Sequence, residues 1–457
     1  MNPFAGRHVH LMGIGGCGMR ALVPLLRRCG ATISGCDVAD SSTVQALRAT
    51  GCQVWLGHDP AHLDGVDVVV HTSAVASNHH ELRQAQANGC DIMSRASCLA
   101  ELMRDHRTVA VVGSHGKTST AWMLAHLLRS AGRDPAVMIG GAGELVDEDH
   151  VGGDDWFVAE IDESDGGFGH VDPRIVVVTN LEAEHVRHYG GFPALVQAMA
   201  GWLGQVPEDG LVIAGTERLP EELLAACRCP VRRCGIEAGE IQAHDLRLEA
   251  GGGSARIRWQ GRDHGRLLVP RPGRHMIANA LLAWAAAEAV HPGIDPQALA
   301  TCTPIRRRFT DQGTVAGVRV IEDYAHHPTE VAATIAAAAL GGGAVHVVFQ
   351  PHRYTRTADC FAGFCAAFDQ AAAVVILPVY AAAEDPVAGP GARDLAEAIA
   401  GRRGADGARV QHLRQIAAAV DFLAAHARPG DCCLVLGAGD VGRVIEPLRA
   451  ALARGRS

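Results

Sequence analysis

Short apolar runs alternate along the chain with longer segments rich in alanine and leucine. The apolar runs predict buried strands, among them HVHLM, ATISGCD, VDVVV, TVAVV, IVVVTN and CCLVL. The segments between them, such as MRALVPLLRRCG and NALLAWAAAEAV, have the length and composition of helices. Strands that alternate with helices build parallel sheets from βαβ units. The pattern therefore predicts an α/β protein with parallel sheets.

The alternating pattern restarts twice, which divides the chain into three regions. A predicted helix, CLAELMRD, ends near His106, and a new strand, TVAVV, follows at once. The segment TCTPIRRRF then predicts a linker, and VRVIEDYAHHP begins a third run. A chain of 457 residues also has the length of about three domains. We predict domains at 1–106, 107–302 and 303–457, with a hairpin at EAGGGSARIRW in the second.

Composition excludes some classes of partner. Hydrophobic residues make up 48% of the chain but aromatic residues only 4%, so aliphatic side chains must build the cores. The net charge of −9 argues against nucleic acid or an anionic membrane as a partner. We find neither an apolar stretch of membrane-spanning length nor a signal peptide. We expect a cytoplasmic protein, in line with the cysteine usage described next, and either a monomer or a weak homodimer.

The 14 cysteines include no C-x-x-C pair, which favours reduced thiols over a disulfide framework. The densest group is Cys227, Cys229 and Cys234. No fourth ligand with a familiar zinc spacing follows it. Reduced thiols are therefore favoured there over a zinc site.

A glycine-rich loop in the second region carries the strongest chemical signal. It follows the strand TVAVV, opens a predicted helix and consists of Gly113, Ser114, His115, Gly116, Lys117 and Thr118. Glycines let the backbone approach phosphate oxygens, and the helix start directs amides at them. Lys117 supplies positive charge to a transferring phosphate, and the Thr118 hydroxyl can bind Mg²⁺. The alternative is a chance Gly-Lys turn, which the strand–loop–helix context disfavours.

A second glycine loop, GIGGCG, follows the first predicted strand at residues 13–18. Asp37 ends the next strand, about where a dinucleotide-binding enzyme places its ribose-binding carboxylate. An NAD-linked oxidoreductase is therefore one hypothesis, and a tight turn without a ligand is another. Two nucleotide-type loops in one chain favour ATP together with a nucleotide-linked substrate.

Acidic residues gather at the ends of two predicted strands. WFVAEIDESDGGF carries Glu160, Asp162, Glu163 and Asp165, and TNLEAEHVRHY carries Glu182, Glu184, His185 and His188. Carboxylates at a strand end beside a phosphate loop suit metal ligands, and a histidine there could complete the metal shell. The alternative for each cluster is a solvated acidic turn.

Three basic or histidine-bearing clusters lie in the third region. They are Arg306 to Arg308; Asp323, Tyr324, His326 and His327; and Gln350, His352, Arg353, Tyr354 and Arg356. Ligands of open α/β sheets bind beyond the carboxyl ends of strands. Arginines there can hold a carboxylate or phosphate in a bidentate fork. Each cluster alone fits a surface salt-bridge patch, but together they favour a site for an anionic substrate.

The order of these motifs resembles the muramyl ligase family over nearly the whole chain. The matching strings are GIGGCGM, SGCD, VVGSHGKTST, AEIDESDGGF, TNLEAEH, RRRF, DYAHHPTE, VFQPHRYTRT and LGAGDVG. The resemblance implies an N-terminal Rossmann-like domain for the UDP-sugar, a central phosphate-loop ATPase domain and a C-terminal Rossmann-like domain for the amino acid. It also implies an ATP- and Mg²⁺-dependent ligase. The strings GIGGCGM, DYAHHP and FQPHRYTRT are specific to one member of the family. They imply that L-alanine is joined to the carboxylate of UDP-N-acetylmuramate through an acyl phosphate, as a step of peptidoglycan synthesis.

The resemblance also assigns site residues. The UDP-sugar positions are Gly15, Gly16, Gly18, Met19, Asp37, His71, Ser73 and Ala74. The ATP positions are Gly113, Ser114, His115, Gly116, Lys117, Thr118, Ser119, His275, Arg308 and Asp323. The metal positions are Thr118, Glu160 and His185, and the catalytic positions are Lys117, His185, His326, Arg353 and Arg356.

Several positions depart from the family pattern, namely Arg20, Gly167, Glu184, Arg187, Met276 and Glu322. Met276 replaces an asparagine whose amide would contact adenine. These departures leave two further hypotheses open. One is a divergent relative that joins another amino acid or acceptor, and the other is a nucleotide-binding protein that has lost catalysis.

Overall fold

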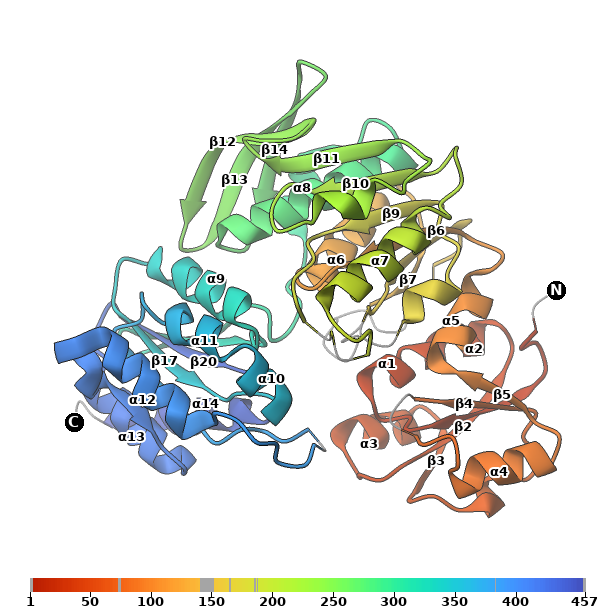
Figure 1. Ribbon diagram of the computed structural model, residues 1–457, viewed down its shortest axis with the longest axis horizontal. Helices are drawn as coiled ribbons and strands as arrows, with labels where there is room; N and C mark the ends of the chain where they lie inside the picture. Colours follow the sequence, from red (N-terminus) through yellow and green to blue (C-terminus); the bar gives the residue numbers. More distant parts are fainter. Residues whose placement is uncertain are drawn as a thin grey trace. The chain divides into compact units, whose positions relative to one another are not determined.

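The computed structural model describes residues 3–72, 75–139, 152–163, 166–184, 186, 188–382 and 384–454. It divides into two compact units. The first holds Met1–His244, Arg256–Leu267 and Ala278–Leu299, and the second holds Asp245–Ala255, Leu268–Ile277 and Ala300–Ser457. Three sheets with flanking helices form these units (Figure 1). Within the described ranges, no helix has the length and apolar character needed to span a bilayer.

The first sheet has five parallel strands in the order β3-β2-β1-β4-β5. Its strands are β1 (His8–Met12), β2 (Thr32–Asp37), β3 (Gln53–Leu56), β4 (Val68–His71) and β5 (Asp91–Ser94). The connecting helices are α1 (Cys17–Arg20), α2 (Leu22–Arg28), α3 (Ser42–Ala49), η1 (Pro60–Leu63), α4 (His80–Ala87) and α5 (Arg95–Met103). Side chains alternate across a strand. Val9 and Leu11 thus join the core on one face, and Met12 joins a smaller cluster on the other.

The second sheet has nine strands in the order β14-β13-β12-β11-β10-β9-β6-β8-β7. They are β6 (Arg107–Val112), β7 (Ala136–Met138), β8 (Trp156–Glu160), β9 (Ile175–Val178), β10 (Leu211–Gly215), β11 (Val231–Ile236), β12 (Ile241–Glu249), β13 (Gly252–Trp259) and β14 (Arg262–Val269). The helices are α6 (Lys117–Ser130), η3 (Gly167–His170), α7 (Phe192–Leu203), η4 (Glu221–Leu224), α8 (Arg274–Val290) and η5 (Pro296–Thr301). The hairpin predicted from EAGGGSARIRW is present, because β12 and β13 are neighbours joined by a short turn.

The third sheet has six strands in the order β15-β16-β20-β17-β18-β19. They are β15 (Thr310–Val315), β16 (Val318–Asp323), β17 (Val345–Phe349), β18 (Ala373–Ile376), β19 (Val410–His412) and β20 (Cys432–Leu436). The helices are α9 (Pro328–Ala339), α10 (Tyr354–Asp359), α11 (Phe361–Ala367), α12 (Ala392–Arg403), η6 (Gly404–Arg409), α13 (Ile416–His426), η7 (Val441–Val444) and α14 (Ile445–Arg454). Val347 and Phe349 face the core under α9, α11 and α12, whereas Val348 faces the core under α13 and α14.

The predicted α/β class is confirmed, with one difference in the third sheet. β15 pairs antiparallel with β16 and forms the edge of that sheet. The sequence analysis missed this strand because its residues, TDQGTV, are mostly polar and none of them is buried. An edge strand needs no apolar face of its own, so it leaves no periodic signal. The first sheet and strands β6 to β11 of the second sheet lie in one compact unit, and the exact domain boundaries stay predictions.

Candidate active site

The loop between β6 and α6 fits tightly against Thr179 and Asn180, the residues that directly follow β9. Gly113 has φ +128°, and a Cβ there would lie 2.3 Å from Oγ1 of Thr179 and 2.5 Å from the carbonyl oxygen of Asn180. Gly116 has φ +82° and forms the N-cap of α6. A Cβ at Gly116 would lie 2.5 Å from Oδ1 of Asn279. Both positions therefore require glycine, as expected where a backbone wraps around phosphate.

Lys117 lies at the first position of α6 and is tied to the loop. Its Nζ donates to the carbonyl oxygen of Gly113 at 2.5 Å and to Oε2 of Glu163 at 2.8 Å. Only 13% of the Lys117 side chain and 1% of the Glu163 side chain are exposed. Burial opposes charge on Lys117, but Glu163 and the neighbouring carboxylates outweigh it and raise the lysine pKa. The ion pair with Glu163 therefore favours a charged ammonium group at the start of the helix.

Lys117 is the only lysine in the chain, and all the other Lys or Arg positions are arginine. The two side chains are not equivalent: lysine carries a compact point charge, whereas arginine carries a broad planar fork. A chain that uses arginine everywhere else keeps lysine at the one position where a phosphate loop needs it. This supports a requirement for the ammonium group itself.

The residues fit a Mg²⁺ ion beside this loop. Oγ1 of Thr118 donates to Oε2 of Glu160 at 2.9 Å, so the two predicted ligands lie together at the ends of α6 and β8. Within the part of the chain that the structure describes, Oε1 of Glu163 is buried without a hydrogen-bond partner. Hydroxyl and carboxylate oxygens are the ligands that Mg²⁺ prefers. The third predicted ligand, His185, lies outside the described residues.

Of the acidic residues predicted near this strand end, Glu160 is the last residue of β8, and Glu163 lies beyond the strand. Glu163 reaches Lys117 from the segment beyond β8.

His115 connects the phosphate loop to the segment after β9. Its backbone N–H donates to Oδ1 of Asn180 at 2.9 Å, and its carbonyl oxygen accepts from Oγ1 of Thr179 at 2.7 Å. Its ring nitrogens lie 3.5 Å from Glu182 and 3.9 Å from Glu184. These contacts hold the loop in shape from both its backbone and its side chain. Ser119, which is also predicted to contact ATP, is buried in the first turn of α6.

Asn279 is a site residue that the sequence analysis missed. It lies on α8, is 8% exposed, and contacts Gly116 closely enough to exclude a Cβ there. The available signal was an amide in a helix otherwise rich in alanine and leucine, four residues after His275. Residues four positions apart lie on the same face of a helix. His275 itself is exposed, and Met276 is half-buried.

The N-terminal glycine loop is held by its own backbone and by Asp37. Oδ2 of Asp37 accepts the N–H of Gly15 at 2.9 Å, and a Cβ at Gly15 would lie 2.8 Å from the same oxygen. Gly16 donates to the carbonyl oxygen of Gly13. Asp37 is the carboxylate that an NAD-linked oxidoreductase would use to bind a ribose. In this structure it instead accepts a hydrogen bond from the loop backbone.

The other residues predicted for the UDP-sugar lie around the same sheet edge or outside the described ranges. Met19 is buried, and a Cβ at Gly18 would meet Arg95 at 3.2 Å. His71 ends β4, and its ring contacts the carbonyl oxygen of Thr72 at 3.1 Å. Ser73 and Ala74 lie outside the described residues. The UDP-sugar assignments stay predictions.

Asp323, at the end of β16, binds backbone N–H groups both before and after it in the sequence. Its oxygens accept the backbone N–H groups of Phe309 and Ala325, both at 2.7 Å. Phe309 has φ +50°, a conformation that costs energy for a residue with a side chain, so this hydrogen bond holds a strained segment in place. Burial raises the pKa of Asp323 to about 6, against the opposing charge of Arg308. The guanidinium group of Arg308 also lies over the Tyr324 ring, 5.1 Å from its centroid.

We expect Asp323→Asn to change how stability depends on pH. A folded-state pKa of about 6 lies above the unfolded value near 3.9. The folded protein therefore binds this proton more tightly, so the contribution to stability is full below about pH 4 and is lost as pH rises through about 6. Urea unfolding at several pH values should show wild type losing stability relative to the variant across this window, by at most about 3 kcal/mol.

Asp440 provides the matched control, because hydrogen bonds from Gln350 and Arg443 lower its pKa. Asp440→Asn should therefore give the opposite slope, with wild type losing relative stability as pH falls below about 4. Parallel stability curves for wild type and Asp323→Asn would contradict a raised pKa at Asp323.

Histidine and arginine side chains meet where β16 and β17 end. The rings of His326 and His352 have centroids 5.9 Å apart, and His352 stacks on Tyr380 at 5.6 Å. One terminal nitrogen of Arg356 lies 3.2 Å from Nδ1 of His352, and Arg356 is only 9% exposed. Burial, together with His326 and Arg356, lowers the pKa of His352 to about 3, so this ring is neutral. His327 forms the N-cap of α9 in a capping box, which is a structural role.

The contacts separate the two arginines that the sequence analysis placed together. Arg353 has φ +71°, is 46% exposed on its side chain, and pairs with Glu384 at 3.4 Å. Arg356 instead packs on His352. Glu384 also accepts a hydrogen bond from the Thr355 hydroxyl at 2.8 Å. A substrate carboxylate would have to compete with Glu384 for Arg353.

Comparisons with known proteins identify the family of the chain. Three family patterns match consecutive parts of the chain: "Mur ligase family, catalytic domain" at residues 8–107, "Mur ligase middle domain" at 111–287 and "Mur ligase, glutamate ligase domain" at 307–439. The chain belongs to the Mur ligase family. Curated relatives of this Mur ligase include the UDP-N-acetylmuramate–L-alanine ligases of Sorangium cellulosum and Acidothermus cellulolyticus. They are 39% and 40% identical to it, over 98% and 96% of this chain and 96% and 93% of theirs.

A solved structure supports the fold of this Mur ligase. UDP-N-acetylmuramate-alanine ligase from Thermotoga maritima matches with a TM-score of 0.81, 22% identity, and coverage of 98% of this chain and 100% of that one. A UDP-N-acetylmuramate:L-alanyl-gamma-D-glutamyl-meso-diaminopimelate ligase from Neisseria meningitides is 30% identical, with a TM-score of 0.59, and covers 66% of this chain.

Proposed function

We propose that this Mur ligase is an ATP-dependent enzyme that joins L-alanine to the carboxylate of UDP-N-acetylmuramate. The observation that carries the proposal is the phosphate loop, in which Lys117 stands charged at the start of α6 and Thr118 pairs with Glu160. The full-length relatives at 39% and 40% identity, which carry the name of this activity, support the choice of substrates. An NAD-linked oxidoreductase would leave the phosphate loop without a role.

The reaction brings two anions together, and the loop residues serve that step. The substrate carboxylate attacks the γ-phosphate of ATP and forms an acyl phosphate, while ADP leaves. Lys117 lowers the repulsion between carboxylate and phosphate and stabilises charge on the transferring group. Thr118 and Glu160 would hold Mg²⁺, which supplies further charge neutralisation when bound. Gly113 and Gly116 leave the backbone close enough to contact phosphate oxygens.

The second step requires a free amine and a held amino acid. The amine of L-alanine attacks the acyl carbon, the C–O bond to phosphate breaks, and inorganic phosphate leaves. The amine must lose a proton, and a neutral histidine can accept one. Among the candidates, His326 contacts Glu330 at 3.3 Å, a carboxylate that can stabilise the charged ring. His352, with its low pKa, is the weaker base.

We expect the two arginines to act on the amino acid to different extents. A guanidinium group holds a free α-carboxylate by charge-assisted hydrogen bonds worth about 1.5–3 kcal/mol. Arg356→Ala should therefore raise the KM for L-alanine by about 10- to 100-fold, with much less effect on the KM for ATP. Arg353→Ala should do the same more weakly, because Glu384 already pairs with Arg353. Steady-state phosphate release measures both constants.

A panel of amino acids with UDP-N-acetylmuramate and ATP tests the proposed function. L-Alanine should be the best acceptor, with L-serine and glycine slower, because one methyl or hydroxyl group separates substrates by about 1–3 kcal/mol. The panel should also contain alaninamide and the tripeptide named for the Neisseria relative. Use of alaninamide as well as alanine would exclude carboxylate recognition. A better rate with the tripeptide or with a large or acidic amino acid would overturn the choice of L-alanine.

A further inference from the structure

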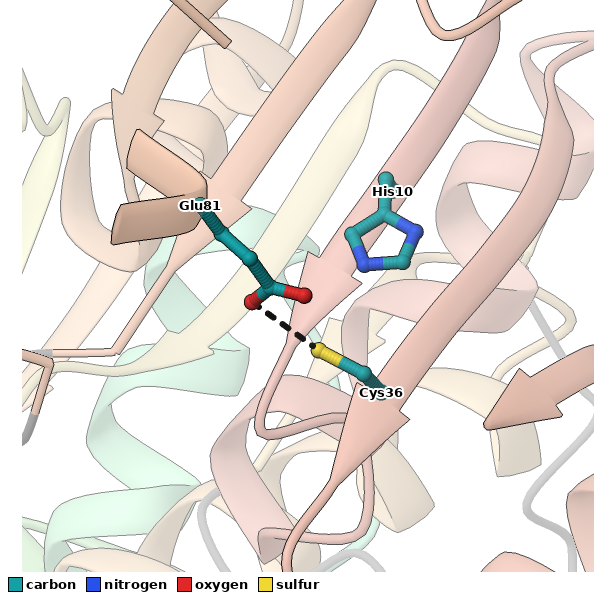
Figure 2. A group of neighbouring side chains, drawn as sticks. All are labelled: His10, Cys36 and Glu81. Carbon is teal, nitrogen blue, oxygen red and sulfur yellow. Dashed lines mark hydrogen bonds between the residues drawn. The ribbon is translucent and has the colours of Figure 1, made fainter. Parts of the chain in front are cut away.

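A buried group of polar side chains lies under the first sheet, on the face that α4 and η1 cover. The register pairs His10 of β1 with Ser34 of β2, and Met12 with Cys36. Side chains two positions apart on a strand share a face. His10 and Cys36 therefore point to the same side of the sheet, and Glu81 reaches them from the first turn of α4 (Figure 2).

The three side chains bring an imidazole nitrogen, a thiol and a carboxylate into one space. One ligand atom from each of His10, Cys36 and Glu81 lies within 4.8 Å of the other two. The thiol of Cys36 donates to Oε2 of Glu81 at 3.6 Å, and all three residues are 0% exposed. Nitrogen, sulfur and carboxylate oxygen are the donors that bind Zn²⁺ in proteins.

His10 supplies the second observation. Its Nδ1 lies 3.0 Å from Oγ of Ser34, whereas its Nε2 is buried without a hydrogen-bond partner among the described residues. In Figure 2 a ring nitrogen of His10 points toward the space between Cys36 and Glu81. When Nδ1–H donates to Ser34, Nε2 carries a lone pair directed at that space. A buried acceptor with no donor is costly, and a metal ion would satisfy it.

The surroundings suit a cation of charge +2. The thiolate of Cys36 and the carboxylate of Glu81 would balance that charge, with the thiol proton released to solvent on binding. His58 Nδ1 lies 2.7 Å from Oε2 of Glu81, and the backbone N–H of Asp59 donates to Oε1 at 2.9 Å. Such partners orient a metal-binding carboxylate.

We propose that His10, Cys36 and Glu81 form a Zn²⁺ site that links β1, β2 and α4 of the first sheet. The site is structural rather than catalytic, because it is buried on the face of the sheet that η1 and α4 cover. It is independent of the proposed ligase activity and would exist in the protein without nucleotide or substrate. Its function is to hold the first sheet in place immediately before Asp37, which fixes the N-terminal glycine loop.

The test is a Co²⁺ and Zn²⁺ titration of the chelator-treated full-length protein. Wild type should bind one Co²⁺ with a thiolate-to-cobalt charge-transfer absorption band, and Zn²⁺ should displace it. Cys36→Ser should abolish the band and weaken Zn²⁺ binding at least tenfold in competition with a chromophoric chelator. Cys90→Ser is the matched control, because Cys90 follows α4 and its thiol donates to the carbonyl oxygen of Val66. This variant should keep both the band and the affinity.

Glu81→Gln provides a second variant, in case Cys36→Ser fails to fold. It should keep the cobalt–thiolate band while weakening Zn²⁺ binding by about tenfold or more. Circular dichroism checks that each variant is folded. Absence of the band in wild type would overturn the proposal, as would its persistence in folded Cys36→Ser or unchanged Zn²⁺ affinity in folded Glu81→Gln.

Discussion

Lys117→Ala should reduce ligase turnover by at least about 10²–10³-fold while leaving the binding of UDP-N-acetylmuramate nearly unchanged. Loss of one charged group that stabilises a transition state typically has an effect of this size. The variant also leaves the carboxylate of Glu163 buried without its partner, since only 1% of that side chain is exposed. Phosphate release measures turnover, and calorimetry with the UDP-sugar measures binding.

Lys117→Arg distinguishes a need for charge from a need for lysine. The guanidinium group keeps the charge but is broader than the ammonium group, which sits 2.5 Å from the Gly113 carbonyl oxygen. We expect this variant to recover stability through Glu163 but to recover little turnover. Near-normal turnover in Lys117→Ala would remove the phosphate-loop assignment altogether.

Gly116→Ala should also reduce turnover and stability strongly. Gly132→Ala is its control, because it separates the backbone cost from the steric contact with Asn279. The two glycines lie at opposite ends of α6 and have nearly equal φ angles, +82° and +79°. A methyl group at Gly132 meets nothing within 4 Å, whereas one at Gly116 would lie 2.5 Å from Oδ1 of Asn279. Both variants carry the backbone cost of about 1–2 kcal/mol for a left-handed residue, but only Gly116→Ala displaces the loop.

The measurements for this pair are the unfolding temperature and turnover. Both variants should lose stability, with the larger loss for Gly116→Ala, and only Gly116→Ala should lose turnover by about 10²-fold or more. Equal activities in the two variants would mean that the close approach of the loop to α8 has no role in catalysis. Gly116→Ala combined with Asn279→Ala should recover part of the lost stability, because the shorter side chain removes the contact.

Much of the fold and of the phosphate loop could be predicted from local sequence. Runs such as TVAVV and IVVV are buried on both faces of a parallel sheet, so the sequence shows them as continuous apolar segments. Lys117 and Thr118 were predictable because their chemistry depends on a few adjacent residues and a strand–loop–helix order. The polar edge strand β15 has no such pattern, since edge pairing depends on backbone hydrogen bonds and not on side chains.

The rest of the site depends on contacts between distant segments. Glu163 reaches Lys117 across 46 positions of the chain, and no spacing rule connects the two residues. Asn279 of α8 meets the loop at Gly116, a contact between distant segments that composition does not encode. Arg353 and Arg356 are close in sequence, but the turn at Arg353 directs one to Glu384 and the other to His352. Proximity along the chain could not predict these separate contacts, and a shared role for the two arginines stays a prediction.

A chain with one lysine has one side-chain amine, and in this protein that amine is in the phosphate loop. Acylating or reductively methylating reagents need an unprotonated and accessible amine. The ion pair with Glu163 keeps the Lys117 amine protonated, and only 13% of its side chain is exposed. The folded side chains should therefore resist amine chemistry until the loop opens. The labelling rate of a single peptide, followed by mass spectrometry, would then report the opening of that loop directly. Methods that attach a protein through exposed lysine side chains would therefore fail with the folded protein.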